Sequence, residues 1–383
     1  MYKAYKFRMY PNKEQREKLN QNLGSSRFVY NYYLNKKNET YKKDGISLSL
    51  GDLKRDLPRL QIEYPWLKDV DGCVIRTSLE DLDKAYLNFF KKQNGFPKYK
   101  KKSFHEKYRT VCIRGNYKET SYANIRVDLQ RGVIKLPKID EIKIRGYRTL
   151  KDFSYKIINA TVEMVASRYY VSVCVEEENP NIRVIPRKIV AVDLGVKDLV
   201  ITSDGIKYKA MEKMLTYEKK IKGLNRALAR SVKGSRNRGK LIIKIERVYQ
   251  KLRNMRKYYI HLITSKLVKE NDIIVTEDLN VQKMIEEGKK KHFAKYLINS
   301  SLSEIIRQIE YKSEWYGKRH YKVNRYYASS QICNHCGYKN SEIKDLNIRK
   351  WTCVECKCEN DRDINASLNL LDMGVKYYIE NYI

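Results

Sequence analysis

Two pairs of cysteines near the C-terminal end constrain the fold of this chain more than any other feature. They are separated by a 16-residue gap and consist of Cys333, Cys336, Cys353 and Cys356. Two Cys-x2-Cys pairs at this spacing are typical of a zinc site closed by four thiolates, which is structural and carries out no hydrolysis. Metal binding worth on the order of 10–16 kcal/mol allows so short a ribbon to fold. We therefore expect a zinc ribbon, with Cys358 as a spare thiol that can substitute for one ligand.

The charge of the chain predicts a polyanionic partner. Its 383 residues include 79 Lys and Arg against 45 Asp and Glu, a formal net charge of +34. Nucleic acid is the commonest large polyanion, and an acidic membrane surface is the rival, although no amphipathic basic helix stands out. No window approaches 18 apolar residues and the N-terminal residues lack an apolar signal segment. We expect a cytoplasmic protein with access to the nucleoid and no membrane partner.

The N-terminal half combines short strands with inserted helices. Residues 2–10 alternate as in a strand, and further short strands are expected at 111–113, 124–127, 132–136, 161–165 and 169–175, which suggests a small β-barrel. Helices are expected at 13–19, 25–41 and 74–92. The loop 91–109 holds eight Lys or Arg and one Glu among aromatic residues. It is either a solvated turn or a nucleic-acid contact that combines phosphate binding with base stacking; the candidate residues are Lys91, Lys92, Lys98, Tyr99, Lys100, Lys101 and Lys102.

The pattern changes to α/β from residue 187. Apolar strands are expected at 188–192 and 272–276, each followed directly by an acid, and a further strand at 198–202. Two basic helices, 211–230 and 239–269, are joined by a Gly-rich linker whose Arg236 and Arg238 are also candidate nucleic-acid contacts. A helix at 303–317, a strand at 322–327 and a last helix beginning near residue 363 complete this half.

Acidic residues mark the expected active site. Asp193 and Glu277 end the two apolar strands, and Asp361 and Asp363 lie at the start of the last helix. In an RNase H-like sheet these positions meet in one cleft. Carboxylates gathered there favour Mg²⁺ or Mn²⁺, and two ions about 3.5–4 Å apart support phosphodiester hydrolysis. Each acid also has a structural alternative: a turn for Asp193, a lysine partner for Glu277 and a helix N-cap for Asp361 or Asp363. Only five histidines are present, none in a His-x-His pair, which argues against a histidine-based nuclease.

Three acidic motifs resemble those of one protein family. Residues 189–197 (IVAVDLGVK) resemble the first RuvC motif of transposon-encoded TnpB (OrfB) proteins, 275–279 (VTEDL) the second and 361–369 (DRDINASLN) the third. The ribbon segment 329–337 and the segments 3–11 and 95–100 are similar to the family's as well. The resemblance therefore extends over nearly the whole chain.

The resemblance implies an RNA-guided DNA endonuclease related to type V CRISPR effectors. A transposon-derived guide RNA would pair with double-stranded target DNA, and a single Mg²⁺-dependent RuvC-like site would cut it. The implied domains are a wedge-type β-barrel (1–12 and 105–185), a helical recognition insertion (13–104), a RuvC-like nuclease domain (186–328 and 359–383) and a zinc ribbon that binds the target nucleic acid (329–358).

The resemblance also assigns the metal ligands. Asp193, Glu277 and Asp363 would bind Mg²⁺; Asp363 is preferred because the family's acid lies two residues before the Asn, here Asn365, with Asp361 as the fallback. A transposase that uses the same carboxylates, or a non-catalytic nucleic-acid-binding regulator, are the alternatives. Residues 288–292 are expected to form either a mobile lid over the cleft or an ordinary turn.

Overall fold

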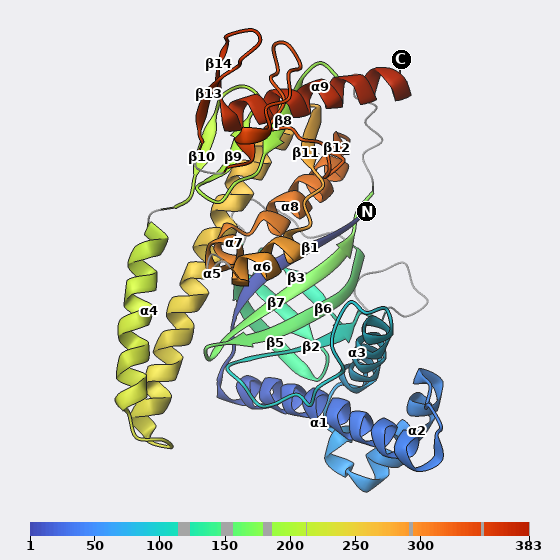
Figure 1. Cartoon of the computed structure of the whole chain (residues 1–383). Helices are drawn as coiled ribbons and strands as arrows, with labels where there is room; N and C mark the ends of the chain where they lie inside the picture. The colour runs from blue at the N-terminus through green and yellow to red at the C-terminus, as the bar shows by residue number, and fades with distance from the viewer. Residues whose placement is uncertain are drawn as a thin grey trace. The chain divides into compact units, whose positions relative to one another are not determined.

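The computed structural model describes residues 1–113, 123–146, 156–178, 186–211, 213–290, 294–345 and 348–382 (Figure 1). The chain divides into two compact units. Unit 1 comprises Met1–Glu178 with Gly223–Gln250, and unit 2 comprises Asn179–Lys222 with Lys251–Ile383.

An antiparallel sheet of seven strands organises unit 1. Its spatial order is β2-β6-β7-β1-β5-β4-β3, and the strands are β1 (Tyr2–Tyr10), β2 (His105–Val111), β3 (Arg126–Asp128), β4 (Val133–Leu136), β5 (Ile139–Arg145), β6 (Lys156–Val165) and β7 (Arg168–Glu176). As predicted, the N-terminal strand joins the later strands, pairing with β7 and β5. The sequence did not predict β5. Among the described residues no ladder joins the end strands β2 and β3, although the Asn124 side chain donates to Val111 O at 3.1 Å. Closure into a barrel stays a prediction.

Three helices form the insertion between β1 and β2. They are α1 (Lys13–Asp44), α2 (Leu50–Glu63) and α3 (Gly72–Phe90), with a short 3-10 turn at Pro65–Lys68. The prediction of two helices between 13 and 41 is wrong, because α1 continues through Gly24, where an added Cβ atom would meet nothing within 4 Å. Gly45 ends α1 at a φ of 69°. The sequence analysis missed α2, which begins with a capping box between Ser49 and Asp52.

Unit 2 is built on a mixed sheet of five strands in the order β10-β9-β8-β11-β12. The strands are β8 (Ile189–Asp193), β9 (Asp198–Thr202), β10 (Lys207–Lys209), β11 (Ile273–Glu277) and β12 (Arg319–Val323). The strands β8, β11 and β12 are parallel, and β9 and β10 are antiparallel to their neighbours. The strand predicted at 322–327 therefore lies earlier, at 319–323.

Helices cover both faces of the unit 2 sheet, which explains why its central strands are continuously apolar. On one face, Val190, Val192 and Ile274 pack against residues of α5 (Arg236–Glu270) and α8 (Leu302–Trp315). On the other face, Ala191 and Val275 pack against Leu370 of α9 (Arg362–Tyr382).

The remaining helices differ from the prediction at their ends. They are α4 (Lys213–Arg230), α6 (Val281–Lys290) and α7 (Ala294–Ser300). The predicted linker between the basic helices is shorter than expected, because α5 begins at Arg236. The predicted lid or turn at 288–292 is wrong over its first part, since α6 runs to Lys290, and its last two residues lie outside the described part of the chain.

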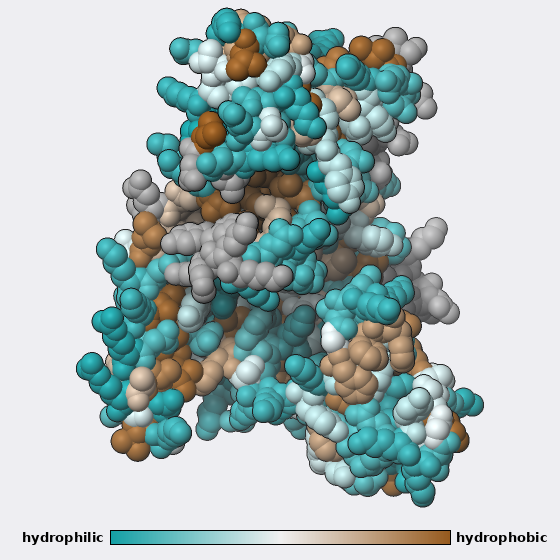
Figure 2. All heavy atoms as spheres, viewed as in Figure 1, coloured by the Kyte–Doolittle hydropathy of each residue, from teal (hydrophilic) through white to brown (hydrophobic). Residues whose placement is uncertain are grey.

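The surface of the face in Figure 2 is mainly hydrophilic, with scattered apolar patches. No helix in the described part of the chain combines the length and the hydropathy that crossing a membrane requires.

Candidate active site

The C-terminal ends of β8 and β11 bring Asp193 and Glu277 to the same edge of the unit 2 sheet. The two strands are parallel neighbours, and Thr276 pairs with Val192, so the acids are the next residues on each strand. Side chains alternate between the faces of a strand. Ala191 and Val275, two residues earlier, pack on the α9 side, and both acids therefore point toward the face that α9 covers.

The start of α9 adds two acids with different partners: Asp361 precedes the helix and Asp363 is in its first turn. Asp361 accepts hydrogen bonds from the backbone N–H groups of Asp363 and Ile364 at 3.1 and 3.2 Å, as an N-cap does. Its other oxygen is 2.7 Å from Nζ of Lys207. Burial alone would raise the pKa of Asp361, but the hydrogen bonds from Lys207 and from these amides lower it overall. The carboxylate of Asp363 is instead 3.1 Å from the guanidinium of Arg349.

Three of the four acids are affected by mutual electrostatic repulsion. The pKa of Asp193 is raised to about 7, first by burial and then by the negative charges of Glu277 and Asp363. Burial raises the pKa of Glu277 too, against the opposing effect of a hydrogen bond that Ser329 donates at 2.5 Å. A divalent cation bound between these carboxylates would neutralise their negative charges and favour their ionised forms.

The four paired cysteines lie together as a second cluster in unit 2. Their sulfur atoms are all within 4.8 Å of one another, and Cys333–Cys356 and Cys336–Cys353 are each separated by 3.6 Å. Among the described residues this is the only group of three or more His, Cys, Asp or Glu side chains that meets this distance. The group excludes Cys358, whose backbone carbonyl accepts from the Cys353 N–H at 2.9 Å.

Local backbone geometry forms this cluster. Gly337 and Lys357 follow the second cysteine of each pair and have φ of 78° and 59°. Their N–H groups donate to the carbonyls of Cys333 and Cys353 at 2.8 and 3.0 Å. Each pair thereby curls into a turn that points two thiols inward. A hairpin of β13 (Lys350–Thr352) and β14 (Glu359–Asp361) then leads directly into α9.

Buried amide side chains join the ribbon to α9, and the sequence analysis missed them. Asn369 donates to the carbonyls of Ser329 and Ile332, both at 2.7 Å. Asn365 donates to Ile332 O at 2.7 Å and accepts from the N–H of Asn334 at 3.0 Å. We call Asn365 and Asn369 the amide latch. Because Ser329 also contacts Glu277, the latch connects the ribbon to two of the acidic positions.

The candidate nucleic-acid contacts fall into two groups. Exposed side chains that can reach a ligand are Lys91, Lys92, Lys98, Lys101, Lys102 and Arg236. Three others make local contacts. Nζ of Lys100 lies 3.8 Å from the centroid of the Tyr30 ring, and the Tyr99 hydroxyl donates to Asn35 at 2.8 Å. The guanidinium of Arg238 donates to Leu228 O at 2.6 Å at the end of α4.

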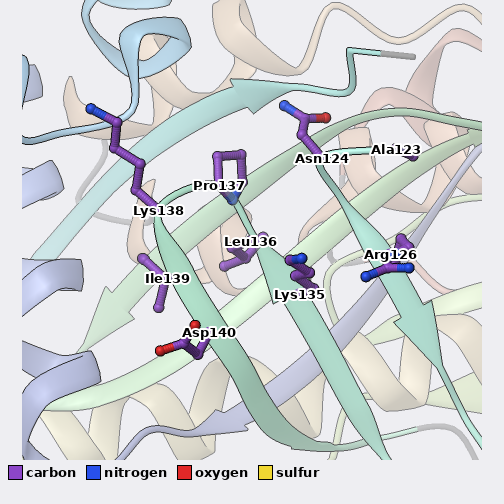
Figure 3. Close-up of a pocket in the computed structure, with 9 residues that line it drawn as sticks. All are labelled: Ala123, Asn124, Arg126, Lys135, Leu136, Pro137, Lys138, Ile139 and Asp140. Atoms are coloured by element: carbon purple, nitrogen blue, oxygen red, sulfur yellow. The ribbon is translucent and has the colours of Figure 1, made fainter. Parts of the chain in front are cut away.

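A basic hollow in unit 1 was not predicted from the sequence (Figure 3). It has a volume of about 550 Å³ and is formed by β3, β4, the start of β5 and the residues just before β3. Arg126 and Lys135 are paired across the β3–β4 ladder, so they share one face. Lys138 lines the hollow too, and Asp140 is the acid among its lining residues. Like charges at paired positions repel, so this face suits an anion.

Three family models match parts of the chain. Residues 172–287 match the OrfB model described as "Probable transposase", and residues 303–370 match "Cas12f1-like, TNB domain". Residues 1–45 match an OrfB model described as "Helix-turn-helix domain", although in this structure the segment consists of β1 and the single helix α1.

Relatives and a solved structure cover nearly the whole chain. A protein of Streptomyces pristinaespiralis named "Putative RNA-guided DNA endonuclease" is 29% identical over 97% of this chain and 89% of its own length. The Escherichia coli K12 protein "Putative RNA-guided DNA endonuclease InsQ" is also 29% identical, over 97% of this chain and 92% of its own. The cryo-EM structure of a Cas12f1–sgRNA–target DNA complex matches 97% of this chain and 98% of the Cas12f1 chain with a TM-score of 0.62. At 15% identity this likeness shows a shared fold.

Proposed function

The chain belongs to the transposon-encoded TnpB (OrfB) family, and we propose that it is an RNA-guided DNA endonuclease with one RuvC-like active site. The observations that carry the proposal are that Asp193 and Glu277 end neighbouring parallel strands of the unit 2 sheet, and that the charges of Glu277 and Asp363 both raise the pKa of Asp193. The names of the relatives and the Cas12f1-like fold support the same reading.

The three carboxylates fit hard divalent cations, and Asp193, Glu277 and Asp363 would hold Mg²⁺ or Mn²⁺. When bound, such ions activate a water molecule and stabilise the leaving oxygen of a phosphodiester. The three carboxylates are spaced more widely than the four sulfur atoms of the cysteine cluster.

Neighbouring side chains position these ligands. Ser329 donates a hydrogen bond to Oε1 of Glu277, and Oε2 would be the oxygen that binds a cation. Asp361 fixes the first turn of α9 as its cap, and this role favours Asp363 as the third ligand. Arg349, 3.1 Å away, offsets the negative charge of Asp363. Since Arg349 is half-exposed, its guanidinium can move to a DNA phosphate when a cation takes its place.

The ribbon would hold structural Zn²⁺ through the four cysteines of the cluster. Four thiolates this close together repel unless a cation lies between them, and the match to the Cas12f1-like TNB model supports this assignment. Through the amide latch, the bound metal would fix the start of α9 and hence the position of Asp363.

Both nucleic-acid partners are part of the proposal. A transposon-derived guide RNA and double-stranded target DNA would account for the net charge of +34. We assign the sheet of unit 1 to the wedge-type domain and α1–α3 to the recognition insertion. The exposed lysines at 91, 92, 98, 101 and 102 are the candidate phosphate contacts on the insertion side.

A transposase is the second candidate function, because the model that matches residues 172–287 is described as "Probable transposase". Strand transfer would use the same carboxylates as hydrolysis. The two differ in their product: a transposase joins DNA ends without guide RNA, whereas the nuclease leaves free ends only where the guide pairs.

The test is to purify the chain together with RNA expressed from the flanking transposon sequence and to sequence the RNA that copurifies. The complex is then given Mg²⁺ and a DNA duplex that matches the guide segment. We expect guide-dependent double-strand cleavage that Asp193→Ala abolishes while RNA binding stays intact. Retention of no locus-encoded RNA, or cleavage that ignores the guide sequence, would refute RNA guidance.

Asp204→Ala is the matched control, since Asp204 is an exposed acid of the same unit in the turn between β9 and β10. It should cut DNA as the wild type does. Equal loss in Asp193→Ala and Asp204→Ala would contradict the assignment of the site. Joined rather than free DNA ends would favour the transposase.

A further inference from the structure

An apolar pocket in the helical insertion of unit 1 has no part in the proposed chemistry. It has a volume of about 730 Å³ and lies between the C-terminal part of α1, the last turns of α3 and the loop that follows α3. Its aromatic walls are formed by Tyr41, Tyr86, Phe89, Phe90 and Phe96. In Figure 2 an apolar patch in brown tones, bordered by hydrophilic surface, lies over the region of α3.

The pocket presents its aromatic rings to solvent. Phe90 is 69% exposed, Tyr41 63% and Phe96 48%. A group of large apolar side chains this exposed marks a binding surface. The rings behind it are fixed: the Tyr86 hydroxyl donates to Asn38 at 2.8 Å, and the Phe89 and Phe96 rings meet edge to face at 5.3 Å. Phe90 stacks on Tyr86 and is tilted against Phe89, and it remains largely exposed.

Lysines line this pocket or lie next to its lining residues in the sequence. Lys42 lines the pocket and is exposed, and the exposed Lys43 follows it at the end of α1. Lys91 and Lys92, also exposed, directly follow Phe90. Asp83 is the acid among the lining residues. Aromatic faces beside lysines are the combination that binds unpaired bases and their phosphates. A second copy of the chain fits poorly, because it would bring these lysines against each other.

We propose that this pocket binds an unpaired nucleobase of a bound nucleic acid, stacked on Phe90 and Tyr41, with its flanking phosphates held by Lys42, Lys91 and Lys92. The inference rests on the proposed function, since it takes the nucleic-acid partner from it. An unpaired base can come from the guide RNA or from a displaced DNA strand, and the two sources share this chemistry.

The test measures binding of the full chain to fluorescent single strands of about 12 nucleotides, one RNA and one DNA, each carrying 5-iodouridine for photocrosslinking. We expect Phe90→Ala to weaken binding about tenfold for the strand that enters the pocket. The salt dependence should stay unchanged, because no charge is lost. The crosslinked peptide of the wild type, found by mass spectrometry, should contain Phe90 or Tyr41. Which of the two strands responds identifies the source of the base.

Ile62→Ala is the matched control, because Ile62 is 72% exposed on α2 of the same unit and lies outside the pocket. It should bind both strands as the wild type does. Unchanged affinity of Phe90→Ala for both strands, or crosslinks only at other peptides, would overturn the proposal. The proposal would also be overturned if the wild-type chain forms a dimer and Phe90→Ala dissociates this dimer without changing the affinity of the chain for either strand.

A parallel cleavage assay separates this inference from the proposed function. If the wild type cuts guided target DNA while Phe90→Ala binds and crosslinks as the wild type does, the pocket assignment fails and the nuclease stands. If the wild type does not cut but Phe90→Ala still weakens strand binding, the nuclease proposal fails and the pocket stands.

Discussion

Gly374 sets how closely α9 can approach the unit 2 sheet. A Cβ atom at this position would lie 2.3 Å from Cγ2 of Val275, a fully buried residue of β11. Contacts under about 3 Å are not tolerated, so Gly374→Ala must move α9, β11 or both. Because Asp363 is in the first turn of α9 and Glu277 ends β11, the substitution should disturb both the stability of unit 2 and the geometry of its acids.

Two opposing effects determine the stability change. Alanine is about 1 kcal/mol more favourable than glycine inside a helix. Overpacking a core costs about 1–3 kcal/mol. We therefore expect a net loss of up to about 2 kcal/mol, or a melting temperature lower by a few degrees. The effect on cleavage should be larger, because a misplacement of about 1 Å in a catalytic group can reduce the rate about 100-fold.

Thermal unfolding followed by circular dichroism and the rate of guided DNA cleavage test this reasoning. Gly223→Ala on α4 is the control, because nothing lies within 4 Å of its added Cβ, and it should be slightly stabilising. Adding Val275→Ala to Gly374→Ala removes both Cγ atoms and leaves the Val275 Cβ at 3.3 Å, a tolerable contact. The double variant should therefore be more stable than the sum of the two single changes.

Two results would refute the argument. One is Gly374→Ala unfolding at the temperature of Gly223→Ala or above while it cuts DNA at the wild-type rate. The other is strict additivity of Gly374→Ala and Val275→Ala, which would mean that the two side chains do not meet.

Three further predictions concern unit 2. If the four cysteines hold zinc, its removal, checked by a metal assay before Mg²⁺ is added back, should abolish guided cleavage. Asn369→Leu leaves the buried Ser329 carbonyl without its donor, while Ile332 O keeps the hydrogen bond from Asn365, and should cost about 1–3 kcal/mol, measured by urea unfolding against the control Asn381→Leu on the exposed end of α9. Burial lowers the pKa of Lys312 from its usual 10.5 to about 8, so the folded protein loses this proton first as the pH rises. Between pH 8 and 10.5 the free energy of unfolding of the wild type should therefore rise by up to about 3 kcal/mol relative to that of Lys312→Met. A difference between the two proteins that does not change with pH would contradict this.

The sequence was most informative where one physical cause dominates. A continuous apolar run that ends in an acid predicted β8 and β11, because strands covered on both faces cannot alternate. The cysteine spacing predicted which four thiols would lie together, since two tight turns can bring only those positions to one point. The TnpB family assignment from the acidic motifs is confirmed by the family models and relatives.

Tertiary contacts account for what the sequence analysis missed. The sequence predicts a break between residues 19 and 25, but α1 buries side chains from Leu19 to Leu34, and the packing of Val29 and Tyr33 with α2 and α3 outweighs the cost of one glycine. Lys100 and Arg238 were selected for their charge, yet a tyrosine ring and a helix end hold their side chains. The amide latch carries no sequence signal of its own, because buried and exposed asparagines look alike until the fold places them.

The position of the ribbon in the chain explains how an acidic site forms in so cationic a protein. Carboxylates that repel one another must be held by the scaffold until a cation arrives. The register of two paired strands fixes Asp193 and Glu277 relative to each other. Asp363 lies on a helix that follows the ribbon, and strand pairing in the five-stranded sheet does not position this helix. The four-cysteine cluster lies between β12 and α9, and the amide latch ties it to the first turns of α9. A metal in the ribbon would thus stabilise Asp363, the one proposed ligand that sheet pairing cannot place, so loss of that metal should reduce the affinity of the acidic residues for Mg²⁺ before unit 2 unfolds.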